Sequence, residues 1–376
     1  LLSHKMIHKL SIFFGMALLG SILPTSAQAA SFSNLYVFGD SLSDTGNISG
    51  FTGGIFPPTP YVDGRFSNGD IWIDYLAQDL GLTSPTPFAS VSLGTPSTNG
   101  INFAFGGATT GTSNTISSQF LSLSEQVQAF STLSGAGVPL DPNGLYAIWA
   151  GANDYLPTSS SFTPYSDPNT PVSNIETAIA NLANLGAKNF LVVNLPDLGA
   201  TPWISGRGVS SINDVKGYNP NGIDPNGNLV QQFSQLTRSH NQLLSQSVSN
   251  LRSQFGPEVT IAEFDVYAAF NEVLNNPSNF GFSNVADPCI YTGMCAISPS
   301  TQAEYFFWDN NHPTTRGHRI TANYAFTALT EEFSKPHPQP VTATEPASGW
   351  GILAVGIVCV GGTIHRYRGN KNRKIG

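Results

Sequence analysis

Short apolar, β-branched runs alternate along the chain with longer stretches in which apolar residues recur at helical spacing. The short runs predict strands at 35–38, 145–149, 190–194 and 259–264, with a weaker one at 101–105. The longer stretches predict helices over 70–80, 174–186, 229–255 and 315–333. Strands that alternate with helices favour a parallel sheet with helices on both faces. Such sheets bind ligands at the carboxyl ends of their strands.

The first thirty residues depart from this alternation. Lys9 gives a basic start, an apolar run follows over 12–23, and Ala27-Gln28-Ala29 forms a small-x-small site. This order is typical of a secretory signal peptide, which we place within 1–30 together with a few upstream residues. A buried first helix or a membrane anchor is the alternative, but the apolar run is short for a span.

The other end of the chain is also distinct. A Pro/Thr-rich linker at 336–348 precedes the segment 349–376, which is apolar first and then basic. Glu345-Pro346 followed by this segment resembles the PEP-CTERM sorting signal, although Thr344 stands where a Pro is usual. The resemblance implies a sorting protease of the exosortase type as a partner, and transient membrane attachment. A plain C-terminal membrane anchor with a cytoplasmic basic tail is the alternative. Both interpretations place the body of the protein, 31–335, outside the cytoplasm.

Composition narrows the classes of function. Charged residues make up 11% and the net charge is −8, without a basic face in the body, so we expect no nucleic acid as partner. Cys289 and Cys295 lie close together in a predicted loop, and an oxidising compartment would pair them in a disulfide. The Cys and His spacings do not match a zinc site, and we expect no metal or cofactor.

The first predicted strand leads directly into Gly-Asp-Ser at 39–41. Ser41 would therefore stand at the mouth of the fold, where Gly39 lets the backbone turn sharply. A helix beginning just beyond would aim its N–H groups at Ser41. Taken alone, a serine after a strand is as often a helix or turn cap.

A second candidate set lies near the other end of the body. A serine hydroxyl needs a base to remove its proton, and a carboxylate must orient that base. Asp309 and His312 are three residues apart, so one turn can bring the carboxylate to the imidazole. By position, His240 and His318 fall within predicted helices, which leaves His312 as the best candidate base.

Two Gly- and Asn-containing loops complete the candidate site. Acyl transfer builds negative charge on a carbonyl oxygen, and fixed donors must meet it. A glycine N–H in the loop at 106–107 and the Asn153 amide after the strand 145–149 are suitable uncharged donors. Each loop taken by itself is also an ordinary turn.

Together these segments resemble the sequence blocks of the SGNH/GDSL hydrolases. GDSLSDTGN, NFAFGGAT, GAND and DNNHPT occur in the family's order between about 35 and 325. The resemblance implies an α/β fold, a flavodoxin-like three-layer α/β/α sandwich with a five-stranded parallel sheet. It also implies Ser41 as nucleophile, His312 as base and acid, and Asp309 as orienting carboxylate. The oxyanion hole would consist of Ser41 N–H, Gly107 N–H and the Asn153 side chain. The G-x-S-x-G motif of the unrelated α/β-hydrolase fold is absent.

We therefore expect an exported serine ester hydrolase of the lipase-like branch, which cleaves acyl esters, lipids or phospholipids. Two alternatives remain open on the sequence. One is a carbohydrate O-acetyl esterase that acts on extracellular polysaccharide. The other is a surface or matrix binding protein on an inactive scaffold, since fold alone does not fix activity.

Overall fold

The computed structural model describes residues 31–97, 99–135, 140–156, 161–206 and 228–335. The chain divides into two compact units, Leu1–Pro336 and His337–Gly376, and all described residues lie in the first. The signal peptide expected within 1–30, the linker at 336–348 and the apolar, basic segment at 349–376 lie outside the described residues. These three assignments, and the domain limits 31–335, stay predictions.

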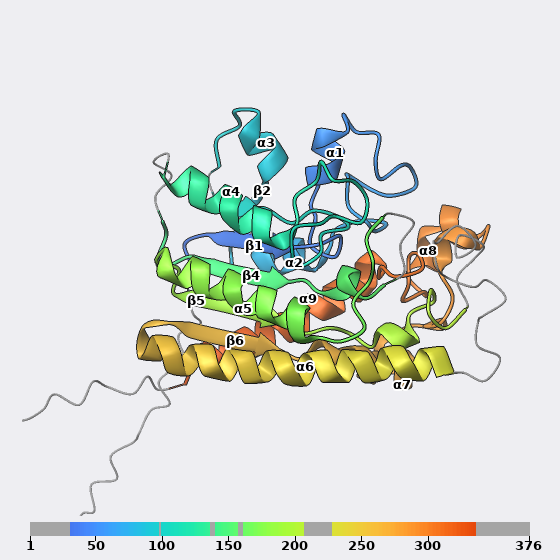
Figure 1. Ribbon diagram of the computed structural model, residues 1–376. Coiled ribbons are helices and arrows are strands. Elements are labelled where there is room, and N and C mark those ends of the chain that lie inside the picture. The colour runs from blue at the N-terminus through green and yellow to red at the C-terminus, as the bar shows by residue number, and fades with distance from the viewer. Residues whose placement is uncertain (1–30, 98, 136–139, 157–160, 207–227, 336–376) are drawn as a thin grey trace, which may run out of the picture. The chain divides into compact units, whose positions relative to one another are not determined.

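A sheet of parallel strands forms the middle of the fold (Figure 1). Its spatial order is β2-β3-β1-β4-β5-β6, and every neighbouring pair is parallel. The strands are β1 (Leu35–Gly39), β2 (Thr86–Pro87), β3 (Ile101–Asn102), β4 (Leu145–Trp149), β5 (Asn189–Val193) and β6 (Thr260–Phe264).

The expected count of five strands is corrected to six by β2. This strand has two residues and pairs with β3 at the edge of the sheet. Pro87 has no N–H to donate, which suits an edge position, and so short a segment has no apolar period to detect. The weak run at 101–105 forms only the two-residue strand β3.

Side chains alternate between the two faces of the sheet, so each face has its own core. Leu35 and Val37 of β1 pack on one side, Tyr36 and Phe38 on the other. The first core is covered by α2 (Trp72–Asp79), α7 (Val266–Asn275) and α9 (Thr315–Phe333). The second is covered by α4 (Leu123–Gly135), α5 (Asn169–Asn184) and α6 (Asn228–Phe255). The result is the expected three-layer α/β/α arrangement (Figure 1).

The four predicted helices correspond to α2, α5, α6 and α9. The pattern missed α4 and α7, and also α1 (Asn47–Phe51), α3 (Phe88–Ser92) and α8 (Pro299–Gln302). The last three have four or five residues, too few for a helical period to show. Short 3-10 turns lie at Ala152–Asp154, Leu198–Ala200, Gly256–Glu258, Pro277–Phe280, Cys289–Tyr291 and Cys295–Ile297. Within the described ranges, none of the helices is both long and apolar enough to cross a membrane.

Buried polar side chains join the loops at the carboxyl ends of β1 and β3. Gln126 of α4 exchanges two hydrogen bonds with the backbone of Gly39, both 2.8 Å long. Asn47 donates to the carbonyl oxygens of Asn102 and Ala104, at 2.9 and 2.8 Å. In a low-dielectric interior such bonds are costly to leave unmade, so they fix the two loops relative to each other.

Gly39→Ala tests how closely the exit of β1 is packed. A methyl group at this position would meet the carbonyl oxygen of Trp149 at 2.2 Å, which the fold can relieve only by moving β1 or β4. We expect a loss of roughly 3 kcal/mol in the free energy of unfolding, measured by urea denaturation. Gly135→Ala is the control, since a methyl group there would meet no atom within 4 Å. Equal stability of the two variants would contradict the packing described here.

Candidate active site

Ser41 lies two residues beyond β1, at the carboxyl edge of the sheet. Asp40 shapes the turn, because its side chain accepts from the amide of Leu42 at 3.0 Å and its carbonyl from the amide of Ser43 at 3.0 Å. This tight turn leaves the side chain of Ser41 at the surface of a cavity.

Asp309 and His312 come from the loop that precedes α9. The Asp309 carboxylate accepts from the amides of Asn311 and His312, both at 2.8 Å, which closes a turn. The same carboxylate lies 2.7 Å from His312 Nδ1, and His312 Nε2 lies 2.7 Å from the Ser41 hydroxyl oxygen. The structure therefore brings the three side chains predicted from the sequence into one hydrogen-bonded line.

The imidazole of His312 and the carboxylate of Asp309 each stabilise the charged form of the other. Burial works against the charged form of His312, but the neighbouring Asp309 carboxylate and a further contribution from Asp40 outweigh it and raise the pKa of the imidazole above 6.5. Burial likewise tends to raise the pKa of Asp309. The attraction of His312 and the hydrogen bonds that the Asp309 carboxylate accepts reverse this, so the pKa of Asp309 is lowered. Asp309 is thus held as a carboxylate beside a ring that takes up protons readily.

Two aromatic residues that the sequence did not single out contact this line. The Tyr61 hydroxyl donates to Asp309 at 2.7 Å, and the Phe66 ring lies 5.3 Å from the His312 ring. Both belong to the loop between α1 and α2, more than 240 positions away from Asp309. No local pattern links them to the site, and only folding reveals their contact.

Gly107 and Asn153 lie in two further loops at the same edge. Gly107 follows β3 and has φ of +75°, a left-handed conformation that favours glycine. Asn153 lies in the turn Ala152–Asp154 after β4, where its side-chain amide donates to the Ala108 carbonyl at 3.1 Å. In the described part of the chain, the amide N–H groups of Ser41 and Gly107 have no acceptor within bonding distance.

Buried carboxylates fix these loops. Asp154 accepts from the amide and hydroxyl of Thr110, at 2.9 and 2.7 Å, which ties the Asn153 turn to the Gly107 loop. Asp44 accepts from the amide of Gly106 at 3.0 Å. Burial raises the pKa of Asp154 to about 7, and that of Asp44 to about 6, although their hydrogen bonds act in the opposite direction.

The expectation that a helix aims its N–H groups at Ser41 is wrong. The next helix, α1, begins at Asn47, and its first amides are bound by the side chain of Asp44. The amide of Asn47 lies 2.6 Å from this carboxylate. The start of α1 is therefore occupied internally and offers no donor to the Ser41 side chain.

A cavity of about 530 Å³ opens over the line of Ser41 and His312. Gly107, Asn153 and Asp309 line it as well. The rest of its wall is more apolar than polar. Its apolar part includes Leu42, Phe56, Phe66, Ile116, Leu156, Leu198, Trp203 and Tyr291, and its polar part Asp40, Tyr61, Thr115, Thr201, Asn310 and Asn311. A site of this kind suits a ligand with a polar reacting group and an apolar remainder.

The other two described histidines do not face this cavity. His240 lies in α6 and His318 in α9, both buried, and burial lowers the pKa of each to about 3. The Nδ1 atom of His240 pairs with the Tyr155 hydroxyl at 2.7 Å. Among the described residues, no group of three or more His, Cys, Asp and Glu side chains could hold a metal ion.

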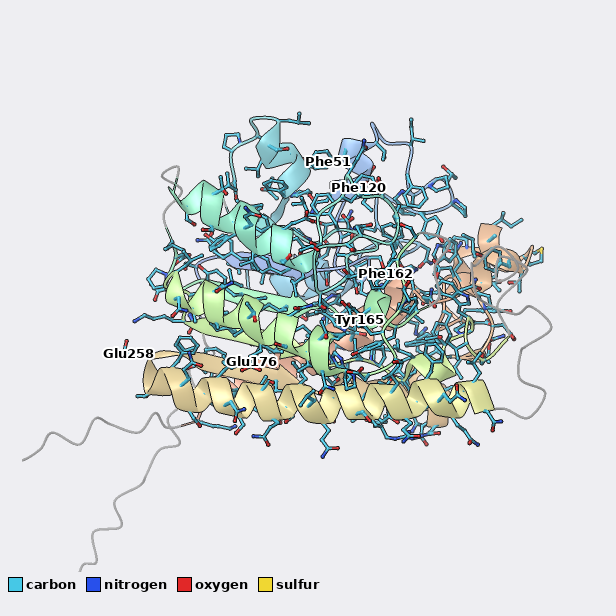
Figure 2. All side chains as sticks on the ribbon, viewed as in Figure 1. Phe51, Phe120, Phe162, Tyr165, Glu176 and Glu258 are labelled. Carbon is cyan, nitrogen blue, oxygen red and sulfur yellow. A yellow bond between two sulfur atoms is a disulfide. The ribbon has the colours of Figure 1, made fainter. Side chains whose placement is uncertain are left out.

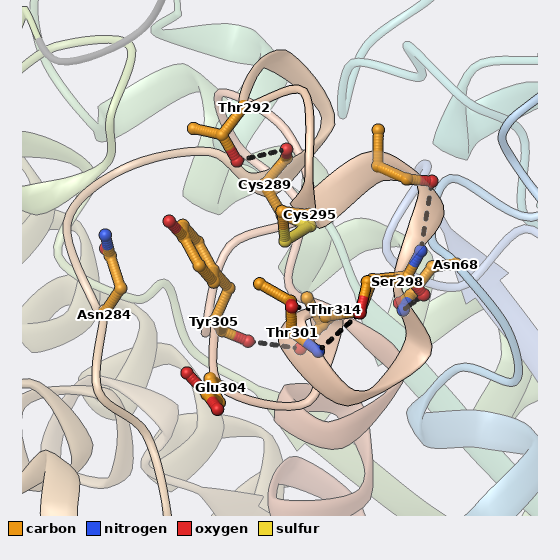
Figure 3. The surroundings of a disulfide bond; sticks show 12 residues. Asn68, Asn284, Cys289, Thr292, Cys295, Ser298, Thr301, Glu304, Tyr305 and Thr314 are labelled. Atoms are coloured by element: carbon orange, nitrogen blue, oxygen red, sulfur yellow. Dashed lines mark hydrogen bonds between the residues drawn. A yellow bond between two sulfur atoms is a disulfide. The ribbon is translucent and has the colours of Figure 1, made fainter.

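Cys289 and Cys295 form a disulfide beside the site (Figure 3). The buried ring of Trp308 packs against both cysteines, one residue before Asp309. The amides of Cys289 and Ile290 donate to the carbonyls of Phe307 and Trp308, at 3.0 and 2.8 Å. The disulfide segment and the loop that carries Asp309 are thus one packed unit.

The titration of His312 tests this electrostatic description. We expect its ring to titrate above 6.5 in histidine-edited NMR spectra, whereas His240 and His318 stay neutral until about pH 3. Asp309→Asn removes the favourable charge, so the His312 pKa should fall. A His312 ring that titrates at the same pH with and without the Asp309 charge would contradict the coupling.

Comparison with known proteins places the chain in a family. The model of the GDSL-like lipase/acylhydrolase family matches residues 35–325. A phosphatidylcholine-sterol acyltransferase of Aeromonas hydrophila is 27% identical over 371 residues, which cover 85% of this chain and 97% of that protein. Acetylajmalan esterase 2 of Rauvolfia serpentina is 27% identical over 346 residues, with 80% and 91% covered.

Among solved structures, this chain is similar to a member of the lipolytic protein G-D-S-L family from Veillonella parvula. It is 12% identical, covers 78% of this chain and 96% of its own, and has a TM-score of 0.39. The family match spans most of the chain and nearly all of the described body. The chain therefore belongs to the GDSL-like lipase/acylhydrolase family and is a hydrolase that acts on ester bonds.

Proposed function

We propose that the protein is an exported serine esterase that cleaves acyl esters, lipid esters included, with Ser41, His312 and Asp309 as its catalytic residues. One observation carries the proposal: His312 lies 2.7 Å from both the Ser41 hydroxyl and the Asp309 carboxylate, at the surface of a cavity that is more apolar than polar. This geometry is what proton transfer from a serine hydroxyl requires.

The reaction proceeds through an acyl-enzyme. His312 Nε2 takes the proton of Ser41 as its oxygen attacks the carbonyl carbon of the ester. The tetrahedral intermediate collapses, the C–O bond to the alcohol breaks, and His312 returns the proton to the departing alcohol. Water then repeats these steps on the acyl-Ser41 bond and releases the acid. Asp309 keeps the Nδ1–H of the ring pointed away from Ser41 and stabilises the imidazolium.

The negative charge on the carbonyl oxygen is met by the amides of Ser41 and Gly107 and by the side chain of Asn153. All three residues line the cavity with His312. The bonds of Asp44 and Asp154 support this assignment, because they fix the two loops before substrate arrives. Donors that need no reorganisation stabilise a transition state most.

Export is proposed from the sequence of 1–30 and from the Cys289–Cys295 disulfide, which suits an oxidising compartment. The tail 336–376 would pass to an exosortase-type sorting protease, or else stay as an anchor. An O-acetyl esterase of extracellular polysaccharide remains a second candidate, because the sorting-tail resemblance favours a cell-surface substrate.

Labelling with a fluorophosphonate probe tests the nucleophile. Ser41→Ala should abolish covalent labelling, because no other hydroxyl in the described site pairs with His312 Nε2. Ser43→Ala is the matched control, since Ser43 lies two residues away and accepts from Trp72 Nε1 at 3.1 Å. Labelling that survives in Ser41→Ala, or is lost in Ser43→Ala alone, would rule out the assignment.

Asn153→Ala tests the oxyanion hole. Loss of one donor should lower kcat by roughly a hundredfold or more and leave KM nearly unchanged, because the interaction strengthens only in the transition state. The measurement is steady-state hydrolysis of p-nitrophenyl butyrate. Asn174→Ala is a control, since Asn174 contacts Thr110 in the neighbouring loop without lining the cavity. A change in KM alone would refute the role.

A comparison of substrates separates the candidate functions. We expect turnover of p-nitrophenyl esters with acyl chains of several lengths and of phosphatidylcholine, with little release of acetate from an acetylated glycan. Preference for the glycan would support the O-acetyl esterase instead. No turnover of any activated ester would contradict the proposed function.

A further inference from the structure

Large exposed apolar side chains gather in three loops of the described structure. Phe51, Ile55, Phe56 and Val62 come from α1 and the loop that follows it, Ile116 from the loop after β3, and Tyr291, Met294 and Ile297 from the disulfide segment. We call these eight residues the apolar rim. Ile55, Met294 and Ile297 are 70–76% exposed, so they contribute little to the protein's own core.

The apolar rim continues into the cavity over Ser41. Phe56, Ile116 and Tyr291, one residue from each loop, are exposed and also line that cavity. The rings of Phe51 and Phe120, both labelled in Figure 2, contact the ring of Phe105. Their centroids lie 5.6 and 6.3 Å from that of Phe105. Each of the three loops therefore contributes one side chain both to the exposed apolar surface and to the cavity wall.

Charge is missing from the three rim segments. The chain has no Asp, Glu, Lys or Arg between Asp44 and Asp63, between Asp79 and Glu125, or between Asp287 and Glu304. Setting these loops against an apolar or zwitterionic layer would desolvate no side-chain charge. They also offer no cation to attract anionic lipid.

The backbone of the disulfide segment is held in place by its packing on the loop before Asp309. Cys289 and Cys295 close a short loop around Met294, and Thr292 donates to the Cys289 carbonyl at 2.8 Å (Figure 3). The buried Trp308 ring packs against both cysteines. The exposed side chains of Tyr291, Met294 and Ile297 thus project from a fixed backbone.

We propose that the apolar rim seats the protein on an uncharged or zwitterionic lipid surface, from which the ester enters the cavity. This inference rests on the proposed function and adds that the substrate is drawn from an aggregated lipid phase. A lipid surface fits better than a protein partner, because a protein seated on the rim would cover the cavity over Ser41. A lipid layer instead supplies the substrate through that opening.

The kinetic test uses the full chain and a short-chain phosphatidylcholine below and above its micelle concentration. The variant Ile55→Ser/Met294→Ser/Ile297→Ser changes three rim residues that do not line the cavity. We expect it to lose roughly tenfold of the rate on micelles and to keep the rate on monomers. Equal losses in both regimes, or no loss on micelles, would overturn the proposal.

Leu93→Ser is the matched control for the loss of exposed apolar area. Leu93 is 81% exposed and follows α3, which leads from the end of β2 back towards the start of β3. It is not one of the eight rim residues and does not line the cavity over Ser41. We expect Leu93→Ser to behave as the unaltered protein does, and a loss on micelles as large as that of the triple variant would overturn the proposal.

Hydrogen exchange separates this inference from the proposed catalysis, because it needs no turnover. In Ser41→Ala, phosphatidylcholine vesicles should slow exchange in 47–62 and 289–297 but not in 88–94. If these segments are protected but the unaltered protein has no turnover, the proposed function is contradicted and the binding of the rim to lipid is supported. Two results would overturn the binding of the rim to lipid. One is turnover by the unaltered protein without protection of either segment, and the other is protection that requires anionic lipid and disappears in high salt.

Discussion

Six parallel strands end at one edge of the sheet, and the meeting of Ser41 with His312 depends on that constraint. The two residues are 271 positions apart, yet Ser41 Oγ lies 2.7 Å from His312 Nε2. Ser41 follows the central strand β1, and Asn153 follows its neighbour β4. His312 lies in the loop before α9, and α9 packs against α2 and β6 in the first core. Parallel pairing therefore collects segments from the whole length of the body.

The site edge contains buried carboxylates, which are costly in an apolar interior. Burial raises the pKa of Asp40 and Asp44 to about 6 and that of Asp154 to about 7. Because these values lie above the pKa of an unfolded aspartate, their contribution to stability is full below about pH 4 and is lost as pH rises through 6 to 7. At neutral pH the fold carries this cost, and backbone amides bound to the carboxylates offset part of it. The same hydrogen bonds fix the loops around Ser41 and Gly107 relative to each other.

The base and the opening of the cavity differ in their chemistry. The loops around Ser41 and Gly107, at the base of the cavity, are joined by many hydrogen bonds. The loops at its opening are uncharged and carry the exposed side chains of Ile55, Met294 and Ile297. A fold alone does not fix the substrate, so the proposed contact with a lipid layer depends on these loops and not on the hydrogen bonds beneath them.

The sequence by itself determined the α/β class, five of the six strands and four of the helices, α2, α5, α6 and α9. In these elements burial on one or two faces leaves a regular spacing of apolar residues along the chain. It also identified Ser41, Asp309 and His312 as candidates, since the local turns that hold them leave short motifs. Only the tertiary structure could decide the rest. The strand β2 is too short for a period, Tyr61 reaches Asp309 from a distant loop, and Asp44 occupies the start of α1 that was expected to face Ser41. These contacts join residues with no sequence relation, so they exist only once the strands have paired and the loops share one edge.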